Sequence, residues 1–125
     1  MKFIHTHKAP KAVGPYSQGV VVKGETLYVS GQIPFIPETM TLVSVDIKEQ
    51  TKQCLTNILA IVNAAGYEKE HIVRCTVYMT DLSQFSLMNE VYQSFFEDHK
   101  PARAAVEVRR LPKDVSVEID AIAVK

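Results

Sequence analysis

The sequence contains no tryptophan, only two cysteines and no excess of charge of either sign. Its 14 Lys and Arg residues balance 14 Asp and Glu residues, so the formal net charge is zero. Broad nonspecific binding to nucleic acid or to an acidic membrane needs a basic surplus, so neither is an expected partner. Hydrophobic runs are also short. The longest, Ile58 to Val62, is far below the roughly 20 apolar residues of a membrane-spanning helix.

Cys54 and Cys75 are far apart in the chain and form no CxxC pair. The favoured interpretation of both is a small buried apolar residue, with a redox role as the weaker alternative. The first residues, Met1 to His5, include no apolar stretch long enough for a signal peptide. Few cysteines and no export signal together predict a reducing, cytoplasmic location.

Motifs for common cofactors are missing as well. The sequence has no Walker loop and no GxGxxG, GxSxG or HExxH motif, so no cofactor is expected. His5 and His7 share one side of an extended segment, but no third ligand stands at a useful spacing. We therefore expect no metal site.

With 125 residues and no internal repeat or linker-like stretch, the chain is predicted to form one domain over residues 1–125. Helices are expected over 46–65, with Asp46 as cap and Gly66 at the end, and from about 83 to 99. Residues 34–45 are typical of a loop with a short edge strand. The predicted strands are Val20–Val22 and Leu27–Val29, joined as a hairpin at Gly24, then Ile72–Thr80, Arg103–Val108 and Val115–Ala123.

The expected order of these elements is β-β-α-β-α-β-β, or β-α-β-β-α-β once the first hairpin strand is set aside. Two helices on one face of a mixed β-sheet define an α+β fold. Because the strands are apolar on both faces, we expect the face without helices to be buried against another subunit.

The last two strands carry an arginine and a carboxylate that could act together. Alternation places Arg103 on one side of its strand and Glu118 on the side of the next strand opposite its apolar residues. If they face a common cleft, the guanidinium can hold a carboxylate and Glu118 can position or deprotonate a water. A plain Arg–Glu ion pair, or charges that face solvent, is the alternative from this pattern alone.

Three further clusters have both a functional and an ordinary interpretation. The turn 14–19 contains Tyr16, which offers an apolar wall with a polar tip. Ser30 and Gly31 stand at a strand end, where glycine lets a ligand approach the backbone. Arg109 and Arg110 belong to a local basic cluster that could contact RNA, although no aromatic platform accompanies it. A packed turn, a bulge and a solvated turn are the respective alternatives.

Taken together, these stretches resemble the reactive intermediate deaminase family, also called the RidA or YjgF-like proteins or endoribonuclease L-PSP. They run in the family's order along nearly the whole chain. The matching segments are Gly14-Pro15-Tyr16-Ser17-Gln18-Gly19, Ser30-Gly31-Gln32-Ile33-Pro34, Asn63-Ala64-Ala65-Gly66, Asn89, Pro101-Ala102-Arg103, Val106-Glu107-Val108, Leu111-Pro112-Lys113-Asp114 and Val117-Glu118-Ile119.

The resemblance implies a chorismate-mutase-like fold and a homotrimer, with sheets around a central barrel and three clefts between subunits. It also implies the activity of a 2-iminobutanoate/2-iminopropanoate deaminase, which hydrolyses reactive 2-imino acids to 2-oxo acids and ammonia. A 2-imino or 2-oxo acid is then the expected small-molecule partner. An RNA-acting protein (endoribonuclease or translation inhibitor) and a non-enzymatic sensor of small carboxylates are the alternatives.

Matched residue by residue, Arg103 corresponds to the family's carboxylate-binding arginine and Glu118 to the glutamate that holds the attacking water. Positions that line the family's cleft are matched by Tyr16, Ser30, Gly31 and Asn89. Ala105 stands where many relatives carry cysteine. Its backbone N–H can still contact a ligand, so substrate binding by this residue is retained as an expectation, whereas any role of the thiol is absent here.

Overall fold

The computed structural model describes residues 1–9 and 11–125. At its centre is a four-stranded sheet with the strand order β3-β8-β6-β7. Its strands are β3 (Thr26–Gln32), β6 (Ile72–Met79), β7 (Ala102–Glu107) and β8 (Val117–Val124). β6 and β7 run parallel, whereas β8 runs antiparallel to its two neighbours, β3 and β6. This mixed sheet confirms the predicted α+β class.

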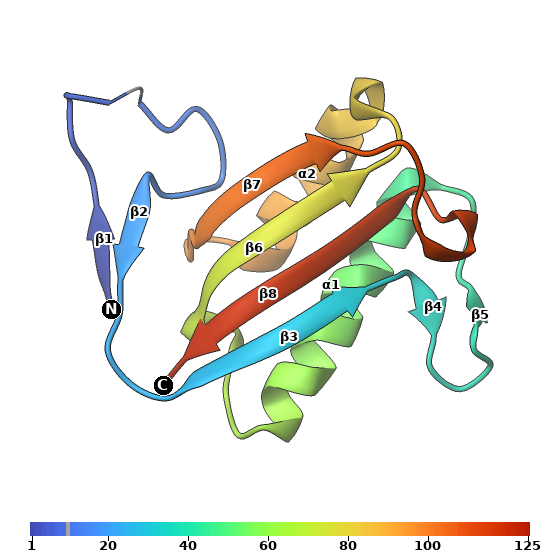
Figure 1. The fold of residues 1–125 in the computed structure, drawn as a ribbon, viewed down its shortest axis with the longest axis horizontal. Helices are drawn as coiled ribbons and strands as arrows, with labels where there is room; N and C mark the ends of the chain where they lie inside the picture. Colours follow the sequence, from blue (N-terminus) through green and yellow to red (C-terminus); the bar gives the residue numbers. More distant parts are fainter. Residues whose placement is uncertain (10) are drawn as a thin grey trace.

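Two helices, α1 (Ile47–Ala64) and α2 (Phe85–Phe96), cover the same face of the sheet (Figure 1). The Asp46 carboxylate caps α1 by accepting a hydrogen bond from the Glu49 backbone N–H at 3.0 Å. Gly66 follows the helix with φ +81°, a left-handed conformation that glycine adopts without strain. Both ends of α1 were therefore readable from the sequence. In the described part of the chain, no helix is long and apolar enough to cross a membrane.

Short 3₁₀ helices connect the main elements. They are η1 (Lys69–His71), η2 (Leu82–Gln84) and η3 (Pro112–Asp114). Asp81 caps η2 through a hydrogen bond from the Ser83 backbone N–H at 2.9 Å, and α2 follows directly. The Asp81 side chain thus caps the short helix η2, whereas α2 itself begins after Gln84 without a side-chain cap.

The hydrophobic core lies between the helices and the sheet. Along β6 and β8, fully buried residues alternate with partly exposed ones, as the period-two pattern predicts. Both cysteines, Cys54 and Cys75, are free and buried in this core, which confirms the apolar interpretation. The large, fully buried side chains include Leu55, Ile58, Ile72, Met79, Met88, Tyr92, Phe96 and Ile119.

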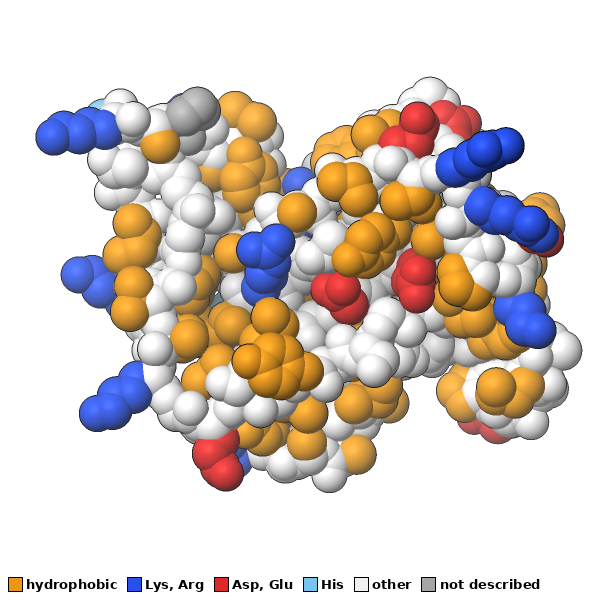
Figure 2. All heavy atoms as spheres, viewed as in Figure 1, with side chains coloured by type: hydrophobic (Ala, Val, Ile, Leu, Met, Phe, Trp, Pro, Cys, Tyr) orange, Lys and Arg blue, Asp and Glu red, His pale blue; other side chains and the backbone are white. Residues whose placement is uncertain are grey.

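The other face of the sheet, here called the open face, carries no helix (Figure 1). Figure 2 looks onto this face and shows acidic and basic side chains near its centre, among hydrophobic ones. Tyr28 of β3 is 75% exposed and Val106 of β7 is 42% exposed. The open face is therefore a mixed surface and less apolar than the sequence pattern suggested.

The predicted hairpin around Gly24 is wrong. β2 (Gly19–Val21) pairs instead with β1 (Lys2–Ile4), and β3 pairs with β8. After the turn, the chain pairs with the C-terminal strand, and Glu25 and Lys125 exchange two backbone hydrogen bonds of 2.9 and 3.0 Å.

The segment 34–45 and the order of the elements along the chain were also predicted from the sequence. Residues 34–45 form a loop with a short two-stranded sheet, β4 (Phe35–Ile36) and β5 (Thr41–Leu42). Along the chain, β2 is followed by β3, α1, β6, α2, β7 and β8, apart from the short strands β4 and β5, which matches the first predicted order and not the alternative. The alternative is wrong because α2 lies between the parallel strands β6 and β7 as a crossover connection.

Candidate active site

Arg103 of β7 lies beneath α2, in the shell of aromatic rings that we call the arginine pocket. Its Nη1 donates a hydrogen bond to Asn89 Oδ1 at 2.7 Å. Its Cζ is 4.8 Å from the centre of the Tyr92 ring and 5.4 Å from that of Phe85. The Tyr16 ring completes the shell at 5.5 Å. The guanidinium is thus held by one hydrogen bond and by cation–π contacts on several sides.

Helical spacing explains why α2 contributes so much to this pocket. Phe85, Asn89 and Tyr92 follow one another at intervals of four and three residues, so they share one face of the helix. Tyr92 is fully buried, whereas Phe85 and Asn89 are partly exposed at the pocket. A single helical stripe therefore supplies both the apolar wall and the amide that orients Arg103.

Tyr16 reaches the pocket from a distant part of the chain. The next residue, Ser17, bonds through its backbone N–H to the Pro101 carbonyl at 3.2 Å and forms a parallel bridge with Ala102. The turn that contains Tyr16 is thereby attached beside the start of β7. Arg103, on β7, is consequently only a short distance from the Tyr16 ring.

The pocket over Arg103 has a volume of about 320 Å³. Besides the groups already named, Val13, Gly14 and Ala105 line it. Gly14 lies against the guanidinium, since a Cβ built on it would stand 3.5 Å from Arg103 Nη2. Apart from the Asn89 amide, which is bonded to Arg103, and the Tyr16 hydroxyl, the walls are apolar, so the guanidinium is the one charged group among the described residues that line this pocket.

Arg103 has no carboxylate partner within residues 1–9 and 11–125. Burial lowers the pKa of its guanidinium below the ordinary value, and arginine nevertheless keeps its charge at neutral pH. A partly buried, unpaired cation favours the binding of an anion, because a carboxylate replaces the lost hydration with charge-assisted hydrogen bonds. The arginine pocket is therefore suited to a small carboxylate ligand.

Glu118 of β8 lies on the open face, next to a β-bulge of β3. The register between β3 and β8 shifts between Val29 and Gln32, which makes Ser30 and Gly31 the bulge. A Cβ on Gly31 would collide with Glu118 Oε1, so glycine at this position lets the carboxylate approach the backbone closely. Ser30, Gly31 and Glu118 together form what we call the glutamate region.

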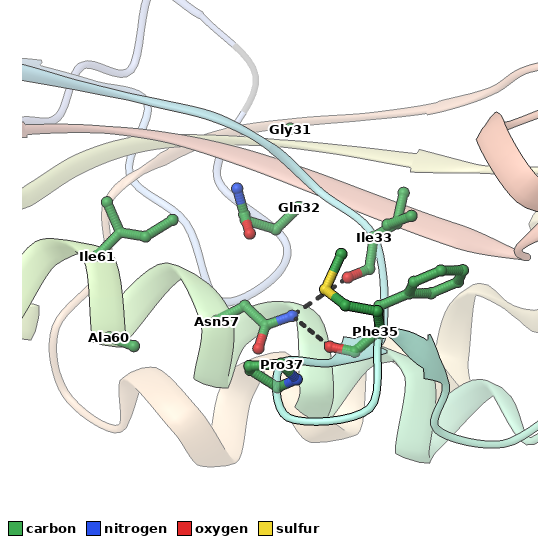
Figure 3. A pocket seen from close by; sticks show the side chains of 9 residues that line it. Gly31, Gln32, Ile33, Phe35, Pro37, Asn57, Ala60 and Ile61 are labelled. Atoms are coloured by element: carbon green, nitrogen blue, oxygen red, sulfur yellow. Dashed lines mark hydrogen bonds between the residues drawn. The ribbon is translucent and has the colours of Figure 1, made fainter.

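A second pocket, of about 380 Å³, lies on the other side of Gly31, between the end of β3 and α1. Figure 3 shows Asn57 of α1 pointing to the segment after the bulge, where its Nδ2 donates hydrogen bonds to two carbonyl oxygens. The acceptors are Ile33, at 3.2 Å, and Phe35, at 3.0 Å. Asn57 thereby anchors the chain that positions Gly31 against Glu118.

A second carboxylate, Asp120, lies two residues from Glu118 on β8. Its Oδ1 accepts a hydrogen bond from the Thr76 backbone N–H at 3.3 Å, and its Oδ2 accepts one from the Tyr78 hydroxyl at 3.2 Å. Burial raises the pKa of Glu118, and the negative charge of Asp120 raises it further. A carboxylate with a raised pKa is a stronger base, which suits proton transfer from water.

Strand register places Arg103 and Glu118 on opposite faces of the sheet. Cys75 of β6 pairs with Arg103 on β7 and with Ala121 on β8. Paired residues point to the same side, so Arg103 shares the helix side with Ala121. Glu118 is three positions from Ala121 and therefore points to the open face. The expectation that both face a common cleft is thus wrong within one chain.

The predicted site residues consequently separate into two groups. The arginine pocket brings together Tyr16, Asn89, Arg103 and Ala105. The glutamate region brings together Ser30, Gly31 and Glu118. Every predicted residue thus has a neighbour from the predicted set, but no single cleft of the described chain contains all seven.

Sequence reasoning overlooked four residues that shape these places. Phe85 and Tyr92 share one face of α2 with Asn89, and this helical spacing is the signal that could have found them. Tyr78 lies on β6 and Asp120 on β8. Their contact depends on the pairing of β6 with β8, for which the sequence contains no local signal.

No metal site is evident in the part of the chain that the structure describes, where no three His, Cys, Asp or Glu side chains form a suitable group. The rings of His5 and His7 stack edge to face with their centres 5.0 Å apart. In the basic cluster, Arg110 forms an exposed ion pair with Asp114 at 2.6 Å, which is the arrangement of an ordinary surface turn.

Comparisons with known proteins agree with this fold. The family model described as Endoribonuclease L-PSP matches residues 6–125. A RutC family protein of Pyrococcus horikoshii is 53% identical over 122 residues, which cover 98% of this chain and 96% of that protein. TdcF of Escherichia coli, named as a candidate reactive intermediate deaminase, is 47% identical over 127 aligned positions, covering 99% of this chain and 97% of TdcF.

Solved structures give the same result. The crystal structure of E. coli TdcF with bound serine has a TM-score of 0.78 at 47% identity and covers 100% of this chain and 99% of its own. The structure of the YjgF gene product of E. coli has a TM-score of 0.77 at 47% identity, with coverage of 100% and 99%. Sequence and fold therefore agree over nearly the full length, and the chain belongs to the endoribonuclease L-PSP family of YjgF-like and reactive intermediate deaminase proteins.

Proposed function

We propose that this protein hydrolyses reactive 2-imino acids, such as 2-iminobutanoate and 2-iminopropanoate, to 2-oxo acids and ammonia, and so prevents damage by these compounds. The observation that carries the proposal is the arginine pocket, in which Arg103 is oriented by Asn89 and has no carboxylate partner among the described residues. A 2-imino acid is a small carboxylate, which is the ligand that this arrangement favours.

The roles of the pocket residues follow from their positions. Arg103 anchors the carboxylate, Asn89 fixes the plane of the guanidinium, and Tyr16 closes one side. Ala105 provides a small wall and a backbone N–H on β7. These residues orient the imine carbon of a bound substrate, and orientation alone accelerates a reaction that already proceeds in water.

The reaction needs one water and no covalent enzyme intermediate. Glu118 holds the water and takes one of its protons while the oxygen bonds to the imine carbon and the imine nitrogen becomes protonated. In the resulting carbinolamine, Glu118 gives its proton to the amino nitrogen and the C–N bond breaks as ammonia leaves. The hydroxyl oxygen forms the C=O bond of the 2-oxo acid and releases its proton to water, which replaces the proton taken up earlier by the imine nitrogen. General acid–base help of this kind is worth about 10²–10⁴-fold.

One chain does not supply both halves of this site. Arg103 and Glu118 lie on opposite sides of the sheet with β6 between their strands, and two strand spacings amount to roughly 10 Å. A four-carbon imino acid is too short for this distance. We therefore propose that the arginine pocket of one copy faces Glu118 of a second copy.

This arrangement supports the homotrimer with three clefts and a central barrel that the family resemblance implies. A closed ring of heterologous contacts gives each Arg103 a Glu118 from the next copy. The exposed Tyr28 and Val106 on the open face fit the same proposal, because large apolar groups at a surface favour contact with another chain.

A coupled assay tests the proposed function. A threonine dehydratase generates 2-iminobutanoate, and semicarbazide competes for it, so an active protein reduces semicarbazone formation. We expect the wild type to do so and Arg103→Ala to fail. Arg110→Ala, which removes an arginine from an exposed ion pair, is the matched control and keeps activity. Full activity of Arg103→Ala would exclude the anchoring role, and no activity of the folded wild type would exclude the function.

A further inference from the structure

Glu118 shares the open face with a hydrogen-bonded pair of side chains, Asp120 and Tyr78. We propose that Asp120 and Tyr78 form a fixed pair that positions Glu118 and keeps its carboxylate a strong base for the hydrolytic step. The inference rests on the proposed function, since it assigns a purpose to the base strength of Glu118.

The hydrogen bonds of Asp120 hold both of its oxygens in place. The Thr76 backbone N–H bonds to one oxygen at 3.3 Å, and the Tyr78 hydroxyl bonds to the other at 3.2 Å. Both donors belong to β6, the strand paired with β8. Both oxygens of Asp120 are thus engaged, and these two bonds hold its side chain on the open face.

The strand geometry places this charge beside Glu118. Glu118 and Asp120 are two positions apart on β8 and therefore share the open face. Tyr78 pairs directly with Glu118 across β6 and β8, yet its hydroxyl is used by Asp120. Glu118 accepts no hydrogen bond from the residues that the structure describes, so its carboxylate is available to a water.

The charge of Asp120 and partial burial both disfavour ionisation of Glu118, and its pKa is raised. Besides Tyr78, the titratable groups on the open face of β6 and β3 are Arg74 and Tyr28. Both pair with Ile122, which is four positions from Glu118 along β8. At 3.3 Å per residue this is roughly 13 Å, beyond the Debye length at physiological salt. Asp120 is therefore the dominant charged neighbour of Glu118 within the described chain.

The pH profile of activity separates this role from simple structural support. Asp120→Asn removes the charge and keeps one carbonyl oxygen, which can still accept from the Thr76 backbone N–H, while the new NH2 group can donate to the Tyr78 hydroxyl. We expect the acidic limb of kcat/KM to move to lower pH, because Glu118 now ionises more easily, and the plateau rate to fall, because a weaker base transfers protons more slowly. Asp98→Asn, which removes an exposed carboxylate elsewhere, should leave the profile unchanged. An unchanged limb in Asp120→Asn would overturn the proposal.

A titration that needs no activity distinguishes this inference from the proposed function. The side-chain carboxyl of Glu118 is followed by ¹³C NMR in the full-length protein, with Glu118→Gln for assignment. We expect its midpoint to fall in Asp120→Asn and to stay in Asp98→Asn. If the midpoint moves but imines are not hydrolysed, the proposed function fails and the electrostatic pairing stands; if it does not move, the inference fails.

Discussion

The arginine pocket and the glutamate region lie on opposite faces of one sheet and are built very differently. Arg103 is surrounded by groups of its own chain, with an amide at 2.7 Å and aromatic rings on several sides. Glu118 touches the Gly31 bulge and stands near Asp120, but it faces outwards and accepts no hydrogen bond from the described residues. One chain is thus equipped to hold a carboxylate, whereas the proposed water attack needs a second surface.

The largest effect is expected at Glu118 itself. Glu118→Gln should reduce kcat by about 10²–10⁴-fold, the range for loss of general acid–base help, while binding of a 2-oxo acid at Arg103 stays unchanged. Steady-state kinetics measure kcat, and isothermal titration with a 2-oxo acid measures binding at Arg103. A kcat within twofold of the wild type would remove Glu118 from the proposed mechanism.

Mixed oligomers test whether the two regions meet between copies. Arg103→Ala and Glu118→Gln should each be inactive alone, yet co-expression of both chains should restore activity. If equal amounts of the two variant chains assemble at random into trimers, about one quarter of the clefts combine an intact Arg103 with an intact Glu118 from the neighbouring copy. Differently tagged chains verify that mixed oligomers form. If verified mixtures stay inactive, the two-copy site is wrong.

A smaller effect is expected for the residue that orients Arg103. Asn89→Ala removes a hydrogen bond to a charged group, worth about 1.5–3 kcal/mol, so kcat/KM should fall roughly 10- to 100-fold, mainly through KM. Gln93→Ala, an exposed residue of the same helix, is the matched control. Equal losses in both variants would indicate a general effect on α2.

The bulge of β3 is expected to respond to one added methyl group. Gly31→Ala places a Cβ against the Glu118 carboxylate, and we expect it to destabilise the protein. In the Glu118→Ala background the same change should cost less, with a coupling of about 0.5–3 kcal/mol between the two sites. Urea unfolding of the four variants measures this coupling. Additive effects would show that Gly31 and Glu118 are independent.

The smallest effect is a pH-dependent change in stability. The pKa of Glu118 is raised in the folded protein, so its ionisation opposes folding above the unfolded pKa, and this cost disappears at lower pH where Glu118 is protonated in both states. Glu118→Gln should therefore raise Tm slightly at pH 8 and leave it unchanged near pH 3. Thermal unfolding at both values provides the measurement. A lower Tm at pH 8 would contradict the assigned direction of the shift.

Local patterns predicted most elements because their signals lie within each segment. Asp46 and Gly66 mark the ends of α1, and alternation marks β6 and β8. The hairpin at Gly24 failed for the opposite reason. A turn signal says that the chain reverses, but the partner of the following strand was the distant C-terminal strand, and no residue near Gly24 indicates that pairing.

The candidate site shows the same division. Alternation along each strand already determined which neighbours of Arg103 and of Glu118 share its side, and the family motifs already named all seven candidate residues. Only the tertiary structure decided that Arg103 faces α2 and Glu118 the open face. The physical reason is that side-chain alternation is a property of one strand, whereas the relation between two strands depends on their hydrogen-bonded register through β6.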